Sequence, residues 1–367
     1  MLRRRKHGFG VWAFHLSASS KGSKEIWSPV FAGRKGVSRP ADCLLTNARV
    51  GGTSTTRDMK LADLAACTLI SLDQCFLSRL AIKRKRDADF DDLLHTLFEA
   101  VRAKRVVCPA HLLTTKYESL KLRDPVEVAK VLNLQQDLSL GCAFHEFWDI
   151  IAWKMLQMVR PSLRFERCKR ARMTWEHGTS LEMKRLRLKA MDQQRVETIN
   201  AVPFPASDYR KGTPYEETLA EIEREREDSM RLLLKGISSG MRVAPRIDWM
   251  AGVRDALMRD RVTLPECAAL LEAVDDGRWR QIDVLRVNSM LFAKIEQGML
   301  EGGRAWRLSD HADIYRLCVS LLCADIATCD NPMKDVLKQT KLEGWCRATV
   351  FTVTKPRALT AYLQSLT

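Results

Sequence analysis

Short-range ligand motifs are missing from this 367-residue sequence. Its 11 cysteines are odd in number and scattered, with no CxxC pair and no Cys/His spacing typical of a zinc finger. This pattern argues against a disulfide framework and a structural zinc site, and it favours a reducing, cytoplasmic setting. An HExxH motif, a phosphate-binding glycine loop, a dinucleotide fingerprint and a Ser/His/Asp order are also absent.

Long apolar runs are missing as well. None approaches the ~18 uninterrupted apolar residues of a membrane span, so we expect no membrane partner. The apolar content of 46% and the charged content of 29% are those of an ordinary soluble chain. Because the chain exceeds the roughly 100–200 residues of one usual core, we expect one large or two smaller globular units.

Acidic residues are scarce at the N-terminus. Residues 1–58 hold 11 Lys/Arg and 3 Asp/Glu, which is +8 of the total net charge of +15. The segment is rich in Gly and Ser and has no sustained hydrophobic period, so we predict a disordered basic tail. Two alternatives stand beside this prediction: a targeting peptide, and a true translation start at Met59.

Past Met59, short apolar runs alternate with helical patterns. Residues 67–73 ("CTLISLD") predict a buried strand that ends at Asp73, and residues 104–110 predict a second strand. An i, i+3, i+4, i+7 stripe between them predicts an amphipathic helix, and residues 111–122 are predicted to form another.

The same alternation returns near the C-terminus. Strands are predicted for residues 324–330 and 348–353, each next to a helical pattern, and residues 356–366 predict a closing helix. Strands and helices in short succession argue for a parallel α/β sheet. Residues 124–305 separate the two pieces and are helical wherever they show a period.

We therefore predict an α/β fold with a parallel sheet flanked by helices and interrupted by a long all-helical insertion. The predicted parts are the tail, 1–58; a first α/β part, 59–123; the helical insertion, 124–305; and a second α/β part, 306–367.

Two acids occupy equivalent places in this pattern. Asp73 ends the first predicted strand and Asp330 ends "ADIATCD". Open parallel sheets bind ligands outside the carboxyl ends of their strands, so neighbouring strands would bring both carboxylates to one edge. Their repulsion calls for a proton or a divalent cation, and an oxygen-only cluster suits Mg²⁺ or Mn²⁺. We interpret Asp325, within the same strand, as an edge-strand acid rather than a ligand.

Three stretches carry a resemblance to a known family: "LISLDQCFLSRLA", "VVCPAHLLTTKYE" and "SDHADIYRLCVSLLCADIATCDNPM". Together they resemble the PIN-domain nucleases, a superfamily of metal-dependent ribonucleases that includes the toxins of many bacterial toxin–antitoxin pairs. The resemblance covers about residues 66–123 and 306–365. Its most specific piece is the Thr-x-Asp pattern that ends at Asp330, with a 17-residue step back to Asp313.

The resemblance implies a PIN-like fold and a set of carboxylates that bind one or two Mg²⁺ or Mn²⁺ ions. Asp73 matches the acid that closes the first strand, and Asp330 matches the acid after the fourth. The other two matches lie on helices, one after the second strand and one before the fourth. The implied catalytic and metal-binding residues are Asp73, Glu118, Asp313 and Asp330.

Two further positions belong to the implied site, and a third departs from the family pattern. Thr328 would orient a ligand or water. Asp310 is a poorer match than Asp313 for the third acid, and it could instead cap the helix with Asp313 at position N3. The chain departs from the family at Cys75, where relatives commonly have Asn, and a thiol is a weaker hydrogen-bond donor than an amide.

The implied activity is hydrolysis of an RNA phosphodiester bond by a metal-activated water. RNA is the expected substrate, and a protein antitoxin or a second copy of the chain is the expected partner. Two other hypotheses stay open: a catalytically weak PIN-like module that binds RNA or protein, and a helical interaction scaffold with an incidental acid cluster. Because like charges would meet at the site, Asp73→Asn is expected to spare stability without metal.

Overall fold

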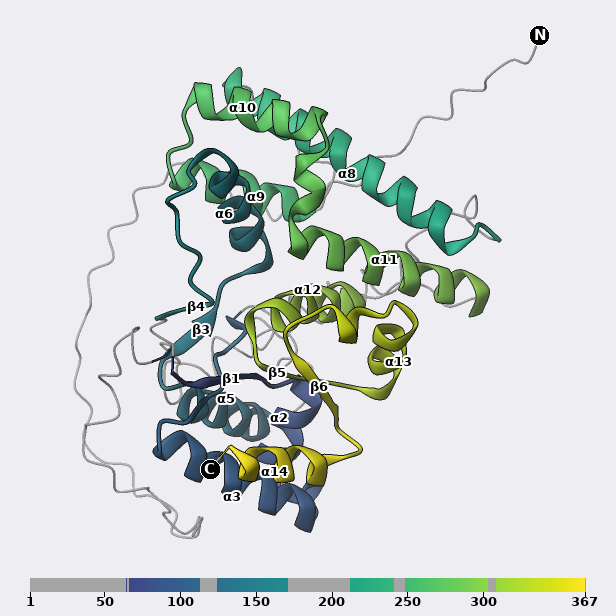
Figure 1. The fold of residues 1–367 in the computed structure, drawn as a ribbon. Helices are drawn as coiled ribbons and strands as arrows, with labels where there is room; N and C mark the ends of the chain where they lie inside the picture. Colours follow the sequence, from purple (N-terminus) through teal and green to yellow (C-terminus); the bar gives the residue numbers. More distant parts are fainter. Residues whose placement is uncertain are drawn as a thin grey trace, which may run out of the picture. The chain divides into compact units, whose positions relative to one another are not determined.

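Two segments far apart in the sequence form one parallel sheet (Figure 1). The computed structural model describes residue 64 and residues 66–112, 124–170, 212–240, 248–302 and 308–366. Four strands pair in the order β2-β1-β5-β6, each pair parallel. Their bounds are β1 Thr68–Ser71, β2 Val106–Val107, β5 Ile326–Cys329 and β6 Thr349–Thr352. The prediction of an α/β fold with a parallel sheet is confirmed.

Helices cover both faces of this sheet. Leu69 and Ile70, neighbours on β1, lie in two different hydrophobic clusters, because successive side chains of a strand point to opposite faces. A sheet buried on both faces needs continuous apolar strands, which explains the runs in the sequence. The helices nearest the sheet are α2 Gln74–Ala81, α3 Ala88–Arg102, α5 Pro125–Ser139, α12 Leu308–Cys323, α13 Asn331–Gln339 and α14 Pro356–Ser365.

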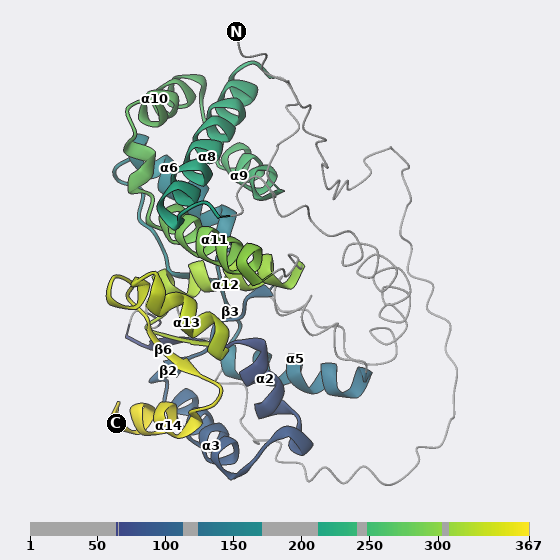
Figure 2. The ribbon, with the colours of Figure 1, turned by 90° about the vertical axis from the view of Figure 1, so that its right-hand side faces the viewer.

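The middle of the chain is mainly helical (Figure 2). In it α8 packs against α10 and α11, and α6 packs against α9. Helix α8 shows why: its buried positions Ile222, Arg226, Met230 and Leu234 recur every four residues and form one face. The bounds are α6 Phe147–Val159, α8 Tyr215–Ser238, α9 Asp248–Arg259, α10 Leu264–Asp275 and α11 Asp283–Gly302, with 3₁₀ turns at Lys83–Lys85, Arg278–Gln281 and Leu342–Gly344.

The prediction that residues 124–305 are all helical is wrong. Strands β3 (Cys142–Phe144) and β4 (Cys168–Arg170) form an antiparallel pair, and a parallel bridge joins Ala143 to Ala110, just after β2. Helix α5 also packs on α2, in the same hydrophobic cluster as α3. Strands of three residues are too short to show a period of two in the sequence, which is why they were missed.

Two of the predicted features lie outside the described residues: the basic tail, 1–58, and the helix expected over 111–122, beyond its first two residues. Within the described ranges, no helix is both long enough and apolar enough to cross a membrane.

Candidate active site

Asp73 and Asp330 lie just beyond the C-terminal ends of the two central strands, β1 and β5, and so at the same end of the sheet. Ser71 of β1 lies opposite Ala327 of β5, so the residues that follow the two strands leave the sheet together. Asp73 caps α2 and Asp330 caps α13, and each carboxylate accepts a backbone N–H of its helix, at 2.7 and 2.9 Å. Asp73 is buried and Asp330 is exposed, so one acid is held by the protein and the other faces solvent.

Thr328 joins the two strands beside Asp73. Its buried hydroxyl accepts the backbone N–H of Asp73 at 2.7 Å and donates to the carbonyl of Ser71 at 3.2 Å. These bonds connect parts of the chain that are 255 and 257 residues apart. Thr328 therefore fixes the backbone of Asp73, which sets the direction of its carboxylate.

A buried arginine on α12 pairs with Asp73. Arg316 Nη2 lies 3.0 Å from Asp73 Oδ1, with the two side chains only 3% and 9% exposed. Arg316 Nη1 also donates to the carbonyl of Thr328 at 3.2 Å. Because little water screens this pair, the attraction between the charges is strong. The contact replaces the repulsion that we expected at Asp73 with attraction. Arg316 is not among the site residues predicted from the sequence.

Cys75 holds the second oxygen of Asp73. Its Sγ donates to Asp73 Oδ2 at 2.7 Å. Burial raises the pKa of the Cys75 thiol far above its usual value, and the charges of Asp73 and, more weakly, Asp330 raise it further. The thiol therefore stays protonated and keeps its hydrogen to donate. Cys75 therefore holds a carboxylate in place here, although a thiol is ordinarily a weaker donor than an amide.

Helix α12 presents a polar stripe to this edge. Ser320 contacts Ser71 within β1, at 2.6 Å between hydroxyl oxygens, and Arg316 contacts Asp73, two residues further along. Helix α12 therefore runs antiparallel to β1. Asp313, one turn before Arg316 on the same face, is placed beyond the end of β1, on the side of the two carboxylates. It is half-buried.

The remaining predicted acids have different outcomes. Helix α12 begins at Leu308, so Asp310 lies inside its first turn and not at the N-cap, the alternative place that its sequence position had left open. Asp310 is half-buried, one turn before Asp313. Glu118 lies in the segment 113–123, outside the described residues.

The donor chemistry of this edge suits a hard divalent cation, since Asp73 and Asp330 both offer carboxylate oxygens. In the part of the chain that the structure describes, however, no three His, Cys, Asp or Glu side chains are grouped closely enough to bind a metal ion. Asp73 instead has donors on both oxygens, from Arg316 and Cys75. A complete site would require Glu118 and an exchange of the Arg316 contact.

A buried network lies one layer beneath the acids. His111 Nε2 is 2.8 Å from the hydroxyl of Ser71 and 3.2 Å from that of Ser320, and its ring stacks on Phe144. Burial lowers the pKa of His111 well below its usual value, and the charge of Arg316 lowers it further. The imidazole is therefore neutral in the folded protein and acts as a structural link between β1 and α12.

This network predicts a pH-dependent stability. Unfolded His111 binds a proton near its ordinary pKa of 6.5, and the folded state excludes it. Stability is therefore complete above that pH and falls as the pH drops below it, by up to about 1.4 kcal/mol per pH unit. The free energy of unfolding, measured in urea between pH 7.5 and 5, should fall less steeply with pH in His111→Asn than in the wild type. The control is His95→Asn, whose exposed side chain on α3 should leave the slope unchanged; equal slopes in all three proteins would contradict this role.

No known protein family, curated protein or solved structure matches this chain. Any functional conclusion therefore depends on the residues themselves and on where the fold places them.

Proposed function

We propose that the protein is a Mg²⁺- or Mn²⁺-dependent endoribonuclease of the PIN-like type. One observation carries the proposal: Asp73 and Asp330, from opposite ends of the chain, leave β1 and β5 at one edge, with Thr328 bonded to the backbone of Asp73. This is the arrangement that the resemblance to the PIN-domain nucleases implies. RNA is the proposed substrate, and the proposed regulator is a protein antitoxin or a second copy of the chain.

The chain's own residues have distinct roles in this proposal. Asp73, Asp313 and Asp330, together with Glu118, would hold the divalent cation. When bound, such a cation neutralises charge on a phosphoryl group and lowers the pKa of a water. The exposed carboxylate of Asp330 faces the solvent from which an RNA strand would approach, whereas the buried Asp73 is immobilised by its neighbours.

In this proposal Arg316 competes with the cation for Asp73. Its guanidinium already supplies a positive charge to Asp73 Oδ1. A divalent cation that approaches this oxygen must displace the guanidinium or share Asp73 with it, and both weaken the binding. The affinity of these carboxylates for Mn²⁺ therefore depends on how firmly Arg316 is held by its other contacts, among them the hydrogen bond to the carbonyl of Thr328.

The same ion pair favours a second candidate function. A PIN-like module that binds RNA or protein without efficient catalysis would keep Asp73 neutralised permanently, and a buried Arg–Asp pair does this. The two candidates differ in one respect: only the nuclease needs the negative charge of Asp330.

Asp330→Asn tests this difference. We expect RNA cleavage in Mn²⁺ to fall by about 100-fold or more, equal to about 2.7 kcal/mol in the reaction barrier, because one anionic oxygen ligand is lost. Stability should change by no more than about 0.5 kcal/mol, because Asn caps a helix as well as Asp does. Cleavage of a mixed-sequence single-stranded RNA and urea unfolding provide the two measurements.

The matched control is Asp87→Asn. Asp87 is also an exposed aspartate that caps a helix, with its carboxylate accepting the backbone N–H of Phe90 at the start of α3. It should cleave RNA like the wild type. If Asp330→Asn also cleaves like the wild type, the capping role alone explains Asp330.

A further inference from the structure

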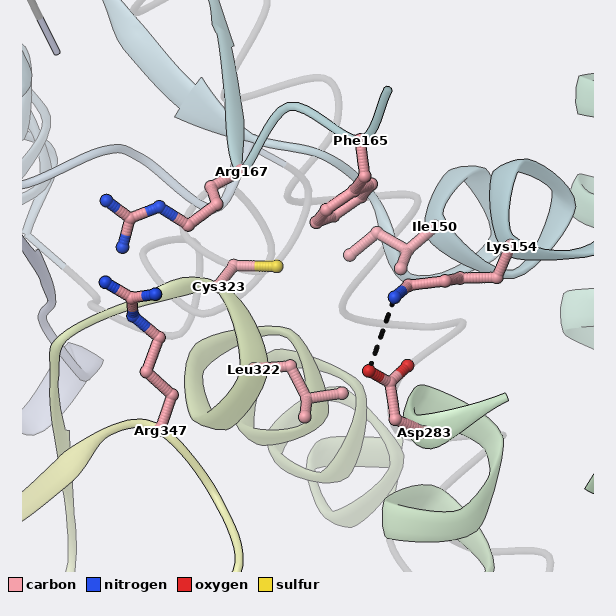
Figure 3. A pocket seen from close by; sticks show the side chains of 8 residues that line it. All are labelled: Ile150, Lys154, Phe165, Arg167, Asp283, Leu322, Cys323 and Arg347. Atoms are coloured by element: carbon pink, nitrogen blue, oxygen red, sulfur yellow. Dashed lines mark hydrogen bonds and ion pairs between the residues drawn. The ribbon is translucent and has the colours of Figure 1, made fainter. Parts of the chain in front are cut away.

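A second candidate site lies at the opposite end of the strands, beside the start of β5. Asp325 immediately precedes β5 and Asp330 immediately follows it, so the two acids are at opposite ends of this strand. Because β5 is an inner strand, between β1 and β6, the interpretation of Asp325 as an edge-strand acid is wrong. Near Asp325 is a cavity of about 240 Å³, lined by residues of the helical middle region, the end of α12 and the loop before β6 (Figure 3). It is therefore separate from the candidate active site.

Two arginines meet at one wall of this cavity. Figure 3 shows the guanidinium groups of Arg167, just before β4, and Arg347, just before β6, facing one another. Both bind the same carboxylate oxygen, Oδ1 of Asp325: Arg167 through Nη1 at 2.9 Å, and Arg347 through Nε at 2.8 Å and Nη2 at 2.7 Å. One negative charge thus faces two positive charges.

Asp325 is a fixed anchor for the arginine pair. Its other oxygen, Oδ2, accepts the backbone N–H of Leu69 at 2.9 Å. Burial alone would raise the pKa of Asp325, but this backbone bond and the two guanidinium groups lower it overall. The carboxylate stays ionised and holds the guanidinium groups at the cavity wall, with one positive charge in excess.

The opposite wall adds a third cation. Lys154 Nζ lies 3.4 Å from Asp283 Oδ2, a long contact for an ion pair, and 5.3 Å from the centre of the Phe165 ring. Ile150 and Leu322 supply apolar surface between the two walls. The cavity is therefore partly apolar, and around it three cationic side chains accompany two acidic ones, Asp283 and the Asp325 that the arginines share.

We propose that this cavity binds the phosphoryl group of a small phosphorylated metabolite between Arg167 and Arg347. Each guanidinium has five N–H donors, and the contacts to Asp325 use one from Arg167 and two from Arg347. Across the described ranges, no other group accepts from either guanidinium. A phosphate monoester has three terminal oxygens that point in different directions, so it can accept hydrogen bonds from both guanidinium groups. A planar carboxylate matches the paired N–H donors of only one guanidinium.

The cavity limits both the size and the chemistry of this ligand. Its volume is below the roughly 300–1,000 Å³ of drug-sized pockets, so the ligand is a phosphate group with a small body. Cys323 lines the cavity, but burial raises the pKa of its thiol to about 12, and the charge of Asp283 raises it too. A neutral thiol is a poor nucleophile, so the site binds its ligand without a covalent step.

Calorimetric titration of the full-length protein tests the proposal, with chloride used to hold the ionic strength constant. Inorganic phosphate and glycerol 3-phosphate are the probes, and a 5′-phosphorylated oligoribonucleotide is the third arm. We expect the wild type to bind the two small probes with millimolar or tighter affinity, and Arg347→Gln and Arg167→Gln each to weaken this binding at least tenfold. Arg347 is 56% exposed, so its replacement should leave the fold intact.

Arg357→Gln is the matched control, because Arg357 is also an exposed arginine bound to one aspartate, Asp89, but lies on α14. It should bind phosphate like the wild type. Equal phosphate affinity in the wild type and in both cavity variants would overturn the proposal, as would a wild type that shows no phosphate binding. If the wild type binds the oligoribonucleotide but neither small probe, and Arg347→Gln loses this binding, the ligand is the phosphorylated end of an RNA and not a small metabolite.

Discussion

Asp73→Asn is expected to abolish metal-dependent RNA cleavage and to lower the free energy of unfolding by about 3 kcal/mol. Asn keeps the cap of α2 but removes the negative charge that Arg316 Nη2 contacts, while the guanidinium itself stays buried. It also removes the anionic oxygen that a hard cation prefers. Urea unfolding in EDTA and RNA cleavage in Mn²⁺ measure the two effects. The structure thus reverses the stability effect that charge repulsion had led us to expect.

The control for Asp73 is Asp149→Asn. Asp149 on α6 is also mostly buried and ion-paired, with Arg259 at 2.7 Å and Lys169 at 3.4 Å, but it lies in the helical region. Its variant should lose stability while the folded protein cleaves RNA at the wild-type rate. A stable Asp73→Asn protein would contradict the importance of the Arg316 pair, and an active one would contradict the metal site.

Arg316→Gln is expected to have opposite effects with and without metal. In EDTA it should lose about 3 kcal/mol of stability, because the charge of Asp73 is left buried and unpaired. Added Mn²⁺ should stabilise this variant more than it stabilises the wild type, since no guanidinium competes for Asp73. The Mn²⁺ concentration that gives half of the stabilisation should be at least about tenfold lower than in the wild type. Urea unfolding across a Mn²⁺ titration measures both.

Arg226→Gln is the matched control for a buried arginine. Arg226 on α8 donates to the carbonyl of Leu285 at 3.3 Å and to the hydroxyl of Ser289, away from the acids. Its loss should destabilise the protein equally in EDTA and in Mn²⁺. If Arg316→Gln instead responds to Mn²⁺ less than the wild type, the arginine assists cation binding rather than competing with it.

The elements around the site were predictable because their patterns are local. The stripe Ile314, Leu317, Cys318 and Leu321 is fully or almost fully buried on α12, and the apolar runs before Asp73 and Asp330 form β1 and β5. Parallel pairing then brings the ends of these strands together, whichever residues follow them. The convergence of the two acids needed only the strand assignments and the general rule for parallel sheets.

The partners of Asp73 could not be predicted in the same way. Arg316 and Ser320 form a polar stripe next to the apolar one on α12, and this was the available signal. Whether such a stripe faces solvent or a buried acid depends on tertiary packing, because the same spacing serves both. The usual donor strength of a thiol predicts a weak contact for Cys75, but burial next to Asp73 makes even a thiol an effective donor.

We propose that the carboxylates beyond β1 and β5 hydrolyse RNA with the help of a divalent cation. The most direct test is to incubate the wild-type protein with single-stranded RNA in Mn²⁺ or in EDTA and to identify the chemical ends of the products. We expect cleavage only in Mn²⁺, and products without 2′,3′-cyclic phosphate, because a water and not the ribose 2′-hydroxyl attacks the phosphorus. Cleavage that persists in EDTA, cyclic phosphate ends, or intact RNA in both buffers would contradict it.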